Sequence, residues 1–138
     1  MAVRMLARRE HSALELRHKL GQRGLAEADI DSAIGRLRQE GLQSDQRFAE
    51  SYVHSRSSRG YGPLRIAAEL RERGVDDGIV ERTLERDHEH WQQRLLQAHQ
   101  RKFGDVPIKD FQDRARRIRF LQYRGFEPDK IHRMLKTL

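Results

Sequence analysis

The sequence of 138 residues contains no cysteine. The lack of thiols excludes a disulfide scaffold, a thiolate zinc site and a cysteine nucleophile. No stretch approaches the roughly 18 consecutive apolar residues that a membrane span needs. The first residues also lack the apolar core of a signal peptide. We therefore expect a cytoplasmic protein that does not contact membranes.

Apolar and aromatic residues are scarce, at 36% and 7% of the chain. Typical soluble domains are roughly 45–50% apolar, so a single large core is not expected. The apolar residues recur with helical spacing, which favours thin helical layers over disorder. The few aromatic residues disfavour a single-strand nucleic-acid binder built on an aromatic platform.

Positive charge is concentrated at one end of the chain. Residues 91–138 carry 12 Lys or Arg against 5 Asp or Glu, so the whole formal net charge of +7 can be assigned to this segment. A concentrated basic segment attracts polyanions. Nucleic acid or a nucleoprotein surface is the partner class this indicates, and a solvated basic face that only aids solubility is the alternative.

The tripeptide Arg-Gly-apolar occurs three times, at residues 23–25, 73–75 and 124–126, with spacings of 50 and 51 residues. Leucine stands five positions before each apolar residue, and isoleucine or valine stands five positions after it. Such self-similarity is typical of tandem supersecondary units. In each unit we expect one helix to end at the arginine, the glycine to take the left-handed position after it, and a second helix to follow.

One further helix is predicted ahead of each pair, at about 2–10, 45–57 and 89–102. Local signals support the helix starts: Ser12 and Glu15 match a capping box, and prolines at 63 and 128 fit a first helical turn. No strand alternation is present. The expected fold class is all-α, three tandem three-helix repeats in an elongated, curved array. We name the segments repeat 1 (1–41), repeat 2 (42–88) and repeat 3 (89–138).

An elongated array has a measurable size. A compact monomer of this length has a radius of gyration of about 14 Å. We expect a monomer with a clearly larger value in small-angle scattering.

No residue pattern indicates catalysis, a metal or a cofactor. His88 and His90 are two positions apart, so on a helix they point to different sides, and the spacing of a zinc-protease motif is absent. The paired carboxylates lie near predicted helix starts, where they are expected to cap free N–H groups. These pairs are Asp29/Asp31, Asp76/Asp77 and Asp110/Asp113. We therefore expect a protein that is not an enzyme and holds no metal or cofactor.

The densest run of arginine lies in the predicted middle helix of repeat 3. Arg116 and Arg119 share one side with Tyr123, while Arg117 and Arg124 are aligned seven positions apart. An exposed arginine row at one-turn intervals suits a phosphate backbone or an acidic protein groove. The candidate contact residues are Arg114, Arg116, Arg117, Arg119, Arg124, Arg133 and Lys136, followed by Arg56, Arg59 and Arg65.

Several long stretches resemble the RecX family of regulatory proteins. The strongest match is DQRFAESYV at 45–53, which continues through GYGPLRI at 60–66. LARREHS at 6–12 resembles the family's opening, and FLQYRGF at 120–126 resembles its close. One departure is Ser44, where the family pattern often has a second aspartate; either residue can serve as a cap.

The resemblance implies a curved protein of three-helix repeats that binds the RecA recombinase. Family members modulate RecA in DNA repair and the SOS response, usually as inhibitors of filament growth, strand exchange and linked ATP hydrolysis. They lodge in the groove of the RecA–DNA filament, can touch single- or double-stranded DNA, and have no catalytic site. The residues themselves leave open a stand-alone DNA-binding protein of helix-turn-helix type, or a scaffold without affinity for polyanions.

Overall fold

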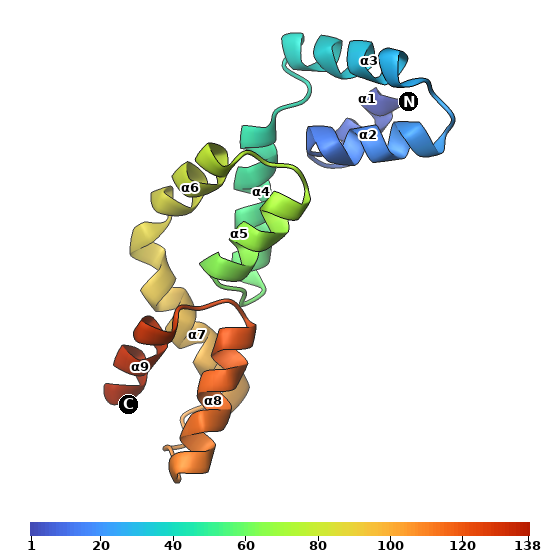
Figure 1. Cartoon of the computed structure of the whole chain (residues 1–138). Helices are drawn as coiled ribbons and strands as arrows, with labels where there is room; N and C mark the ends of the chain where they lie inside the picture. The colour runs from blue at the N-terminus through green and yellow to red at the C-terminus, as the bar shows by residue number, and fades with distance from the viewer. The chain divides into compact units, whose positions relative to one another are not determined.

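The computed structural model describes residues 1–138 as nine α-helices and one 3-10 helix, with no strand (Figure 1). Repeat 1 holds α1 (Ala2–Arg8), α2 (Ala13–Gln22) and α3 (Glu27–Gln39). Repeat 2 holds α4 (Asp45–Ser58), α5 (Pro63–Glu72) and α6 (Asp77–Arg86). Repeat 3 holds the 3-10 helix η1 (His88–His90) at its start, then α7 (Trp91–Phe103), α8 (Phe111–Tyr123) and α9 (Pro128–Lys136). The prediction of an all-α chain of three-helix repeats is confirmed. No helix combines the length and the apolar character that crossing a bilayer would take.

The three Arg-Gly turns end helices as predicted. Gly24, Gly74 and Gly125 have φ angles of 85°, 79° and 102°, a region that residues with a Cβ rarely adopt. After each glycine, the amide of the apolar residue donates to the carbonyl of the leucine five positions earlier, at 3.1–3.4 Å. This is the bonding of a Schellman cap, which satisfies carbonyls at the end of the helix.

Several helix starts are closed by the predicted caps, but α3 begins after Ala26 without a side-chain cap, so the cap expected near Asp29 and Asp31 is absent. The Ser12 hydroxyl accepts from the Glu15 amide, and the Glu15 carboxylate accepts from the Ser12 amide, at 3.1 Å each. Asp110 accepts from the amide of Asp113 at the start of α8. α5 and α9 begin with proline, where the missing N–H removes no helical hydrogen bond.

The chain divides into two compact units, residues 1–52 with 69–83, and residues 53–68 with 84–138. The first unit contains the core of repeat 1, which includes Leu16, Leu20 and Ile34. The second contains the core of repeat 3, which includes Leu95, Leu121 and Ile131. The helices of repeat 2 contribute residues to both units, so the compact units do not follow the sequence repeats.

Each unit contains a joint between neighbouring repeats, built on an Arg-Gly turn. In the first unit a Cβ added to Gly74 would lie 2.7 Å from the Cβ of Leu14, at the start of α2. In the second unit a Cβ added to Gly125 would clash with the Cβ of Arg65 and lie 2.7 Å from its backbone nitrogen. Both turns therefore need glycine for the close approach as well as for the positive φ.

The joint in the second unit also closes the start of α5. The amide of Gly62 donates to the carbonyl of Arg124 at 2.7 Å, and the amide of Leu64 donates to the carbonyl of Gly125 at 2.9 Å. Free amides at a helix start need such acceptors. The turn after α8 thus acts as the cap of α5.

A candidate basic interaction surface

A cluster of arginines and tyrosines lies at the joint of the second unit. The guanidinium carbons of Arg56, Arg65 and Arg124 lie 3.9, 4.6 and 4.7 Å from the ring centroid of Tyr61. Arg65 also lies 4.9 Å from the ring centroid of Tyr123. We call these five residues the arginine–tyrosine cluster. It brings three sequence-predicted candidates from two repeats together around one ring.

Backbone contacts hold the arginine–tyrosine cluster in place. Nη1 of Arg124 donates to the carbonyl of Arg59 at 3.2 Å, so the end of α8 is tied to the end of α4. Nη1 of Arg65 donates to the carbonyl of Tyr123, also at 3.2 Å. Arg101 of α7 donates to the carbonyl of Ser58. These three hydrogen bonds orient Arg65, Arg101 and Arg124 through backbone carbonyls.

The chemistry of the arginine–tyrosine cluster suits anions. Each guanidinium near a ring gains about 0.5–2 kcal/mol from the π face, and a guanidinium carries its five N–H donors in a planar fork. Arg124 has five such donors, of which the contact with Arg59 engages one. Phosphate and carboxylate are the groups that a planar guanidinium binds with two hydrogen bonds.

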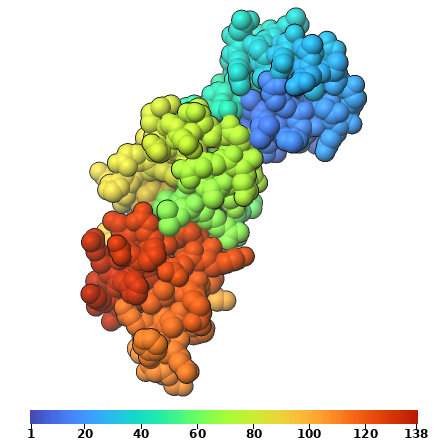
Figure 2. All heavy atoms as spheres, viewed as in Figure 1, coloured from blue at the N-terminus to red at the C-terminus, as the bar shows by residue number.

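The α8 helix presents a second group of candidates. Arg116 and Arg119 are exposed and Arg114 is half-buried, and Tyr123 is 72% exposed. In the space-filling view the α8 segment, coloured orange to red, lies at the surface of the second unit (Figure 2). The predicted side shared by Arg116, Arg119 and Tyr123 is therefore an exposed face.

The remaining candidates lie outside the arginine–tyrosine cluster. Arg59 is exposed and contributes its carbonyl to Arg124. Arg133 and Lys136 are exposed on α9. Arg133 lines a cleft of about 830 Å³ between α7 and α9, whose wall also contains Trp91, Phe126 and Met134.

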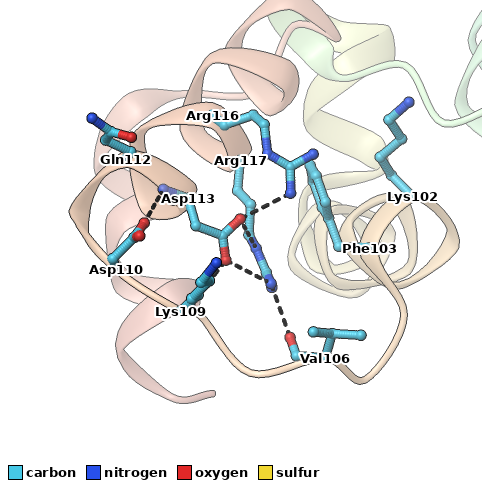
Figure 3. Close-up of a pocket in the computed structure, with 9 residues that line it drawn as sticks. All are labelled: Lys102, Phe103, Val106, Lys109, Asp110, Gln112, Asp113, Arg116 and Arg117. Atoms are coloured by element: carbon cyan, nitrogen blue, oxygen red, sulfur yellow. Dashed lines mark hydrogen bonds and ion pairs between the residues drawn. The ribbon is translucent and has the colours of Figure 1, made fainter.

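Arg117 is buried, so its expected place in an exposed arginine row is wrong. Its side chain is 2% exposed. Nη2 donates to both the carbonyl of Val106, at 3.0 Å, and the carboxylate of Asp113, at 3.1 Å (Figure 3). Nη1 faces Nε2 of His99 at 3.2 Å. All of these contacts lie inside repeat 3, where the guanidinium fixes the loop between α7 and α8.

The charge of Asp113 is held by its neighbours. Its carboxylate accepts from the backbone amide of Lys109, from Arg117 and from Arg116. These hydrogen bonds, the one from Lys109 first, lower the pKa of Asp113 well below its usual range. Asp113 therefore stays ionised and neutralises part of the arginine charge at the start of α8.

His99 is held neutral beside Arg117. Burial lowers the pKa of His99, and the positive charge of Arg117 lowers it further. Since Arg117 can only donate, Nε2 of His99 must be the acceptor in their contact. His11 in repeat 1 has the same arrangement, because its Nε2 lies 3.0 Å from the Lys19 ammonium and burial lowers its pKa.

Two residues of this surface were not singled out from the sequence. Tyr61 stands in the matched stretch at 60–66 without an assigned role, and Lys102, whose Nζ lies 5.3 Å from the ring centroid of Phe120, was not among the candidate contact residues. A tyrosine between two glycines directly before a helix-starting proline was the available signal, because an aromatic residue in such a tight turn is placed at the surface.

Comparison with known proteins covers nearly the whole chain. Models of the first, second and third three-helix domains of RecX match residues 1–37, 44–84 and 89–135. The chain is 47% identical over 135 residues to Regulatory protein RecX of Pseudomonas syringae pv. tomato, covering 97% of this chain and 86% of the relative. It is 45% identical over 134 residues to Regulatory protein RecX of Pseudomonas entomophila, with the same coverage.

Two solved structures share the fold. The crystal structure of RecX from Lactobacillus salivarius matches with a TM-score of 0.85 and 23% identity, over 99% of this chain and 91% of that one. A second crystal structure of regulatory protein RecX matches with a TM-score of 0.81 and 19% identity, over 99% and 68%.

These matches define a class of regulatory proteins built from three three-helix domains. The relatives above are named for regulation. The chain belongs to the RecX family.

Proposed function

We propose that this protein binds the RecA recombinase filament on DNA and inhibits its growth, strand exchange and ATP hydrolysis. It acts by occupying the filament and has no catalytic site of its own. The observation that carries the proposal is the arginine–tyrosine cluster in a member of the RecX family. The family supplies RecA as the partner, and the cluster supplies groups that fit an acidic groove or a phosphate backbone.

The repeats supply the mechanism. A filament presents the same groove at every subunit, and a chain of similar repeats can contact more than one subunit at once. Binding that bridges subunits favours the loss of end subunits or blocks the addition of new ones. Arg56, Arg65 and Arg124 of the cluster, with Arg116 and Arg119 of α8, are the proposed contacts; Arg59, Arg114, Arg133 and Lys136 extend the surface.

Charge reversal on α8 tests the proposed contacts. We expect Arg116→Glu with Arg119→Glu to weaken inhibition of RecA-dependent ATP hydrolysis on single-stranded DNA, because both side chains are exposed and would repel an anionic groove. The measurement is a titration of hydrolysis with each protein. Helical content, measured by circular dichroism, should stay unchanged.

A matched control separates position from net charge. Arg4→Glu with Arg36→Glu makes the same charge change on exposed helices of repeat 1, and it should inhibit like the unchanged protein. Equal inhibition by all three proteins would refute the assignment of α8 as a contact surface.

Binding to bare and RecA-coated DNA separates this function from a stand-alone DNA-binding protein. Fluorescence anisotropy at physiological salt should show tighter binding to the coated strand. Tight, base-dependent binding to bare duplex would instead favour the helix-turn-helix alternative. No binding to either would favour a scaffold.

A further inference from the structure

The two joints between repeats use the same positions of the repeat. Counting back from the glycine of the same repeat, Leu14 stands ten positions before Gly24, and Arg65 stands nine before Gly74. Leu14 contacts Gly74 of the next repeat, and Arg65 contacts Gly125 of the next. In both cases, the start of the middle helix of one repeat receives the Arg-Gly turn of the repeat that follows.

This arrangement leaves one half of a joint open at each end of the series. The turn at residues 23–25, which we call the terminal turn, has no such contact: a Cβ added to Gly24 would meet nothing within 4 Å. The corresponding receiving positions of repeat 3 are Ala115 and Arg116 at the start of α8. Arg116 is exposed.

An open pocket lies at the start of α8, and Arg116, one of the two receiving positions, lines it. Its volume is about 550 Å³. Figure 3 shows its lining residues, which are Lys102, Phe103, Val106, Lys109, Asp110, Gln112, Asp113, Arg116 and Arg117. We call it the terminal pocket. Val106 in its wall is 64% exposed, and Phe111 at the start of α8 is 83% exposed. Apolar side chains this exposed are typical of contact surfaces.

The terminal pocket is also held rigid. The Arg117 guanidinium ties the carbonyls of Val106 and Pro107 to Asp113. α8 begins with a side-chain cap from Asp110, as α2 begins with a cap from Ser12. α2 begins with such a side-chain cap, and its start still contacts Gly74 of the next repeat. A side-chain cap at the start of a helix is therefore compatible with the docking of an Arg-Gly turn.

Charge favours pairing of the two ends. Directly after the terminal turn, the first turn of α3 carries Glu27 and Asp29, both exposed. The lining of the terminal pocket carries Lys102, Lys109, Arg116 and Arg117 against Asp110 and Asp113, so positive charge exceeds negative charge. An acidic element beside the incoming turn therefore meets a basic rim.

We propose that the terminal pocket of one copy receives the terminal turn of a second copy, so that the protein associates head to tail through the same joint that connects its repeats. Such an interface is heterologous and can extend into a row of molecules. Within the chain each joint is helped by the covalent connection, which is equivalent to a local concentration in the millimolar range. Separate copies are therefore monomers when dilute and associate when concentrated or aligned on a filament.

Sedimentation equilibrium of the full chain, without RecA or DNA, tests this. We expect the weight-average mass to rise above the monomer's 16.3 kDa as the protein concentration goes from about 20 µM to about 1 mM. Gly24→Asn should abolish the rise. Asparagine tolerates positive φ, and its side chain has space within the chain, but it would clash in a docked joint as a Cβ would at Gly74.

Gly41→Asn is the matched control. Gly41 also has a positive φ, of 73°, and open space around it, but it lies in neither half of the joint, so the mass should still rise. Val106→Ser, at an exposed position in the wall of the terminal pocket, should abolish the rise by altering the pocket half of the joint.

Mixing the two defective variants distinguishes head-to-tail from other contacts. Gly24→Asn retains its terminal pocket and Val106→Ser retains its terminal turn, so an equimolar mixture should form dimers and nothing larger. A constant monomer mass up to about 1 mM, identical behaviour of Gly24→Asn and Gly41→Asn, or no dimer in the mixture would each overturn the proposal. Because RecA is absent, none of these outcomes depends on the proposed function.

Discussion

Arg117 shows how one buried residue can organise a repeat. Its guanidinium contacts Asp113, His99 and the carbonyls of Val106 and Pro107. A buried charge is tolerated only when its donors are satisfied, and here the acceptors come from three separate segments of repeat 3. The same residue therefore fixes the α7–α8 loop and the walls of the terminal pocket.

Replacement of Arg117 should destabilise the protein without changing its surface. We expect Arg117→Met to lower the free energy of unfolding by about 2–4 kcal/mol, because two carbonyls and a carboxylate lose their donor. Urea denaturation followed by circular dichroism measures the change. Arg119→Met, two positions away in the same helix but exposed, should stay within about 0.5 kcal/mol. Equal losses would contradict the assigned role.

His11 and His99 should make stability depend on pH. Burial lowers the pKa of both histidines in the folded state. Below about pH 6.5 these two side chains therefore bind protons more readily in the unfolded chain than in the folded protein. The free energy of unfolding should therefore fall between pH 7.5 and 5.5, a range in which ordinary carboxylates stay ionised.

The urea midpoint at the two pH values measures this effect. In the double variant His11→Gln with His99→Gln the midpoint should change less between pH 7.5 and 5.5. A fall as large as that of the unchanged protein would mean that other groups are responsible.

At the scale of helices and turns, the same Arg-Gly pattern serves two purposes. All three glycines end a helix, but only Gly74 and Gly125 also make a close contact with the preceding repeat. Replacement by alanine should therefore have unequal effects. Gly24→Ala should lower stability by about 1–2 kcal/mol from backbone strain alone.

Gly125→Ala should be more harmful than Gly24→Ala. It adds a clash with Arg65 to the same strain, and overpacking brings a further loss of about 1–3 kcal/mol. Thermal or urea unfolding of the two variants under identical conditions gives the comparison. If the Gly125→Ala protein were as stable as the Gly24→Ala protein, the joint would accommodate the added Cβ without a loss of stability.

Sequence reasoning located the helices and their ends because these depend on local chemistry. The Arg-Gly turns, the capping box at Ser12 and the prolines at 63 and 128 all act within a few residues. The burial of Arg117 could not be predicted from its place in an arginine row. Helical spacing shows which side of the helix a residue occupies, but not whether that side is buried. Asp113, four residues earlier, was the signal for a pair. The arginine–tyrosine cluster joins residues from two repeats, which spacing within one repeat cannot reveal.

For the whole molecule, the charge distribution predicts a salt effect. The net charge is +7, and the exposed arginines of the second unit are the proposed contacts. Affinity for RecA-coated DNA should fall about tenfold or more between 50 and 200 mM salt, as for other polyanion complexes. Anisotropy titrations at several salt concentrations measure the slope.

The slope should become shallower in Arg116→Gln with Arg119→Gln, by about 0.9 for each duplex phosphate contact that is lost. A flat response in the unchanged protein would indicate that charge does not guide binding, and would favour the scaffold alternative.

The hydrogen bonds that close the start of α5 have a consequence for synthesis. The acceptors for Gly62 and Leu64 are carbonyls of Arg124 and Gly125, which are synthesised well after α5 itself. Repeat 1 carries its own cap at Ser12 and can fold early, whereas the first turn of α5 stays uncapped until the turn after α8 has been made. Formation of this joint is therefore a late folding event that completes α5 and repeat 3 together.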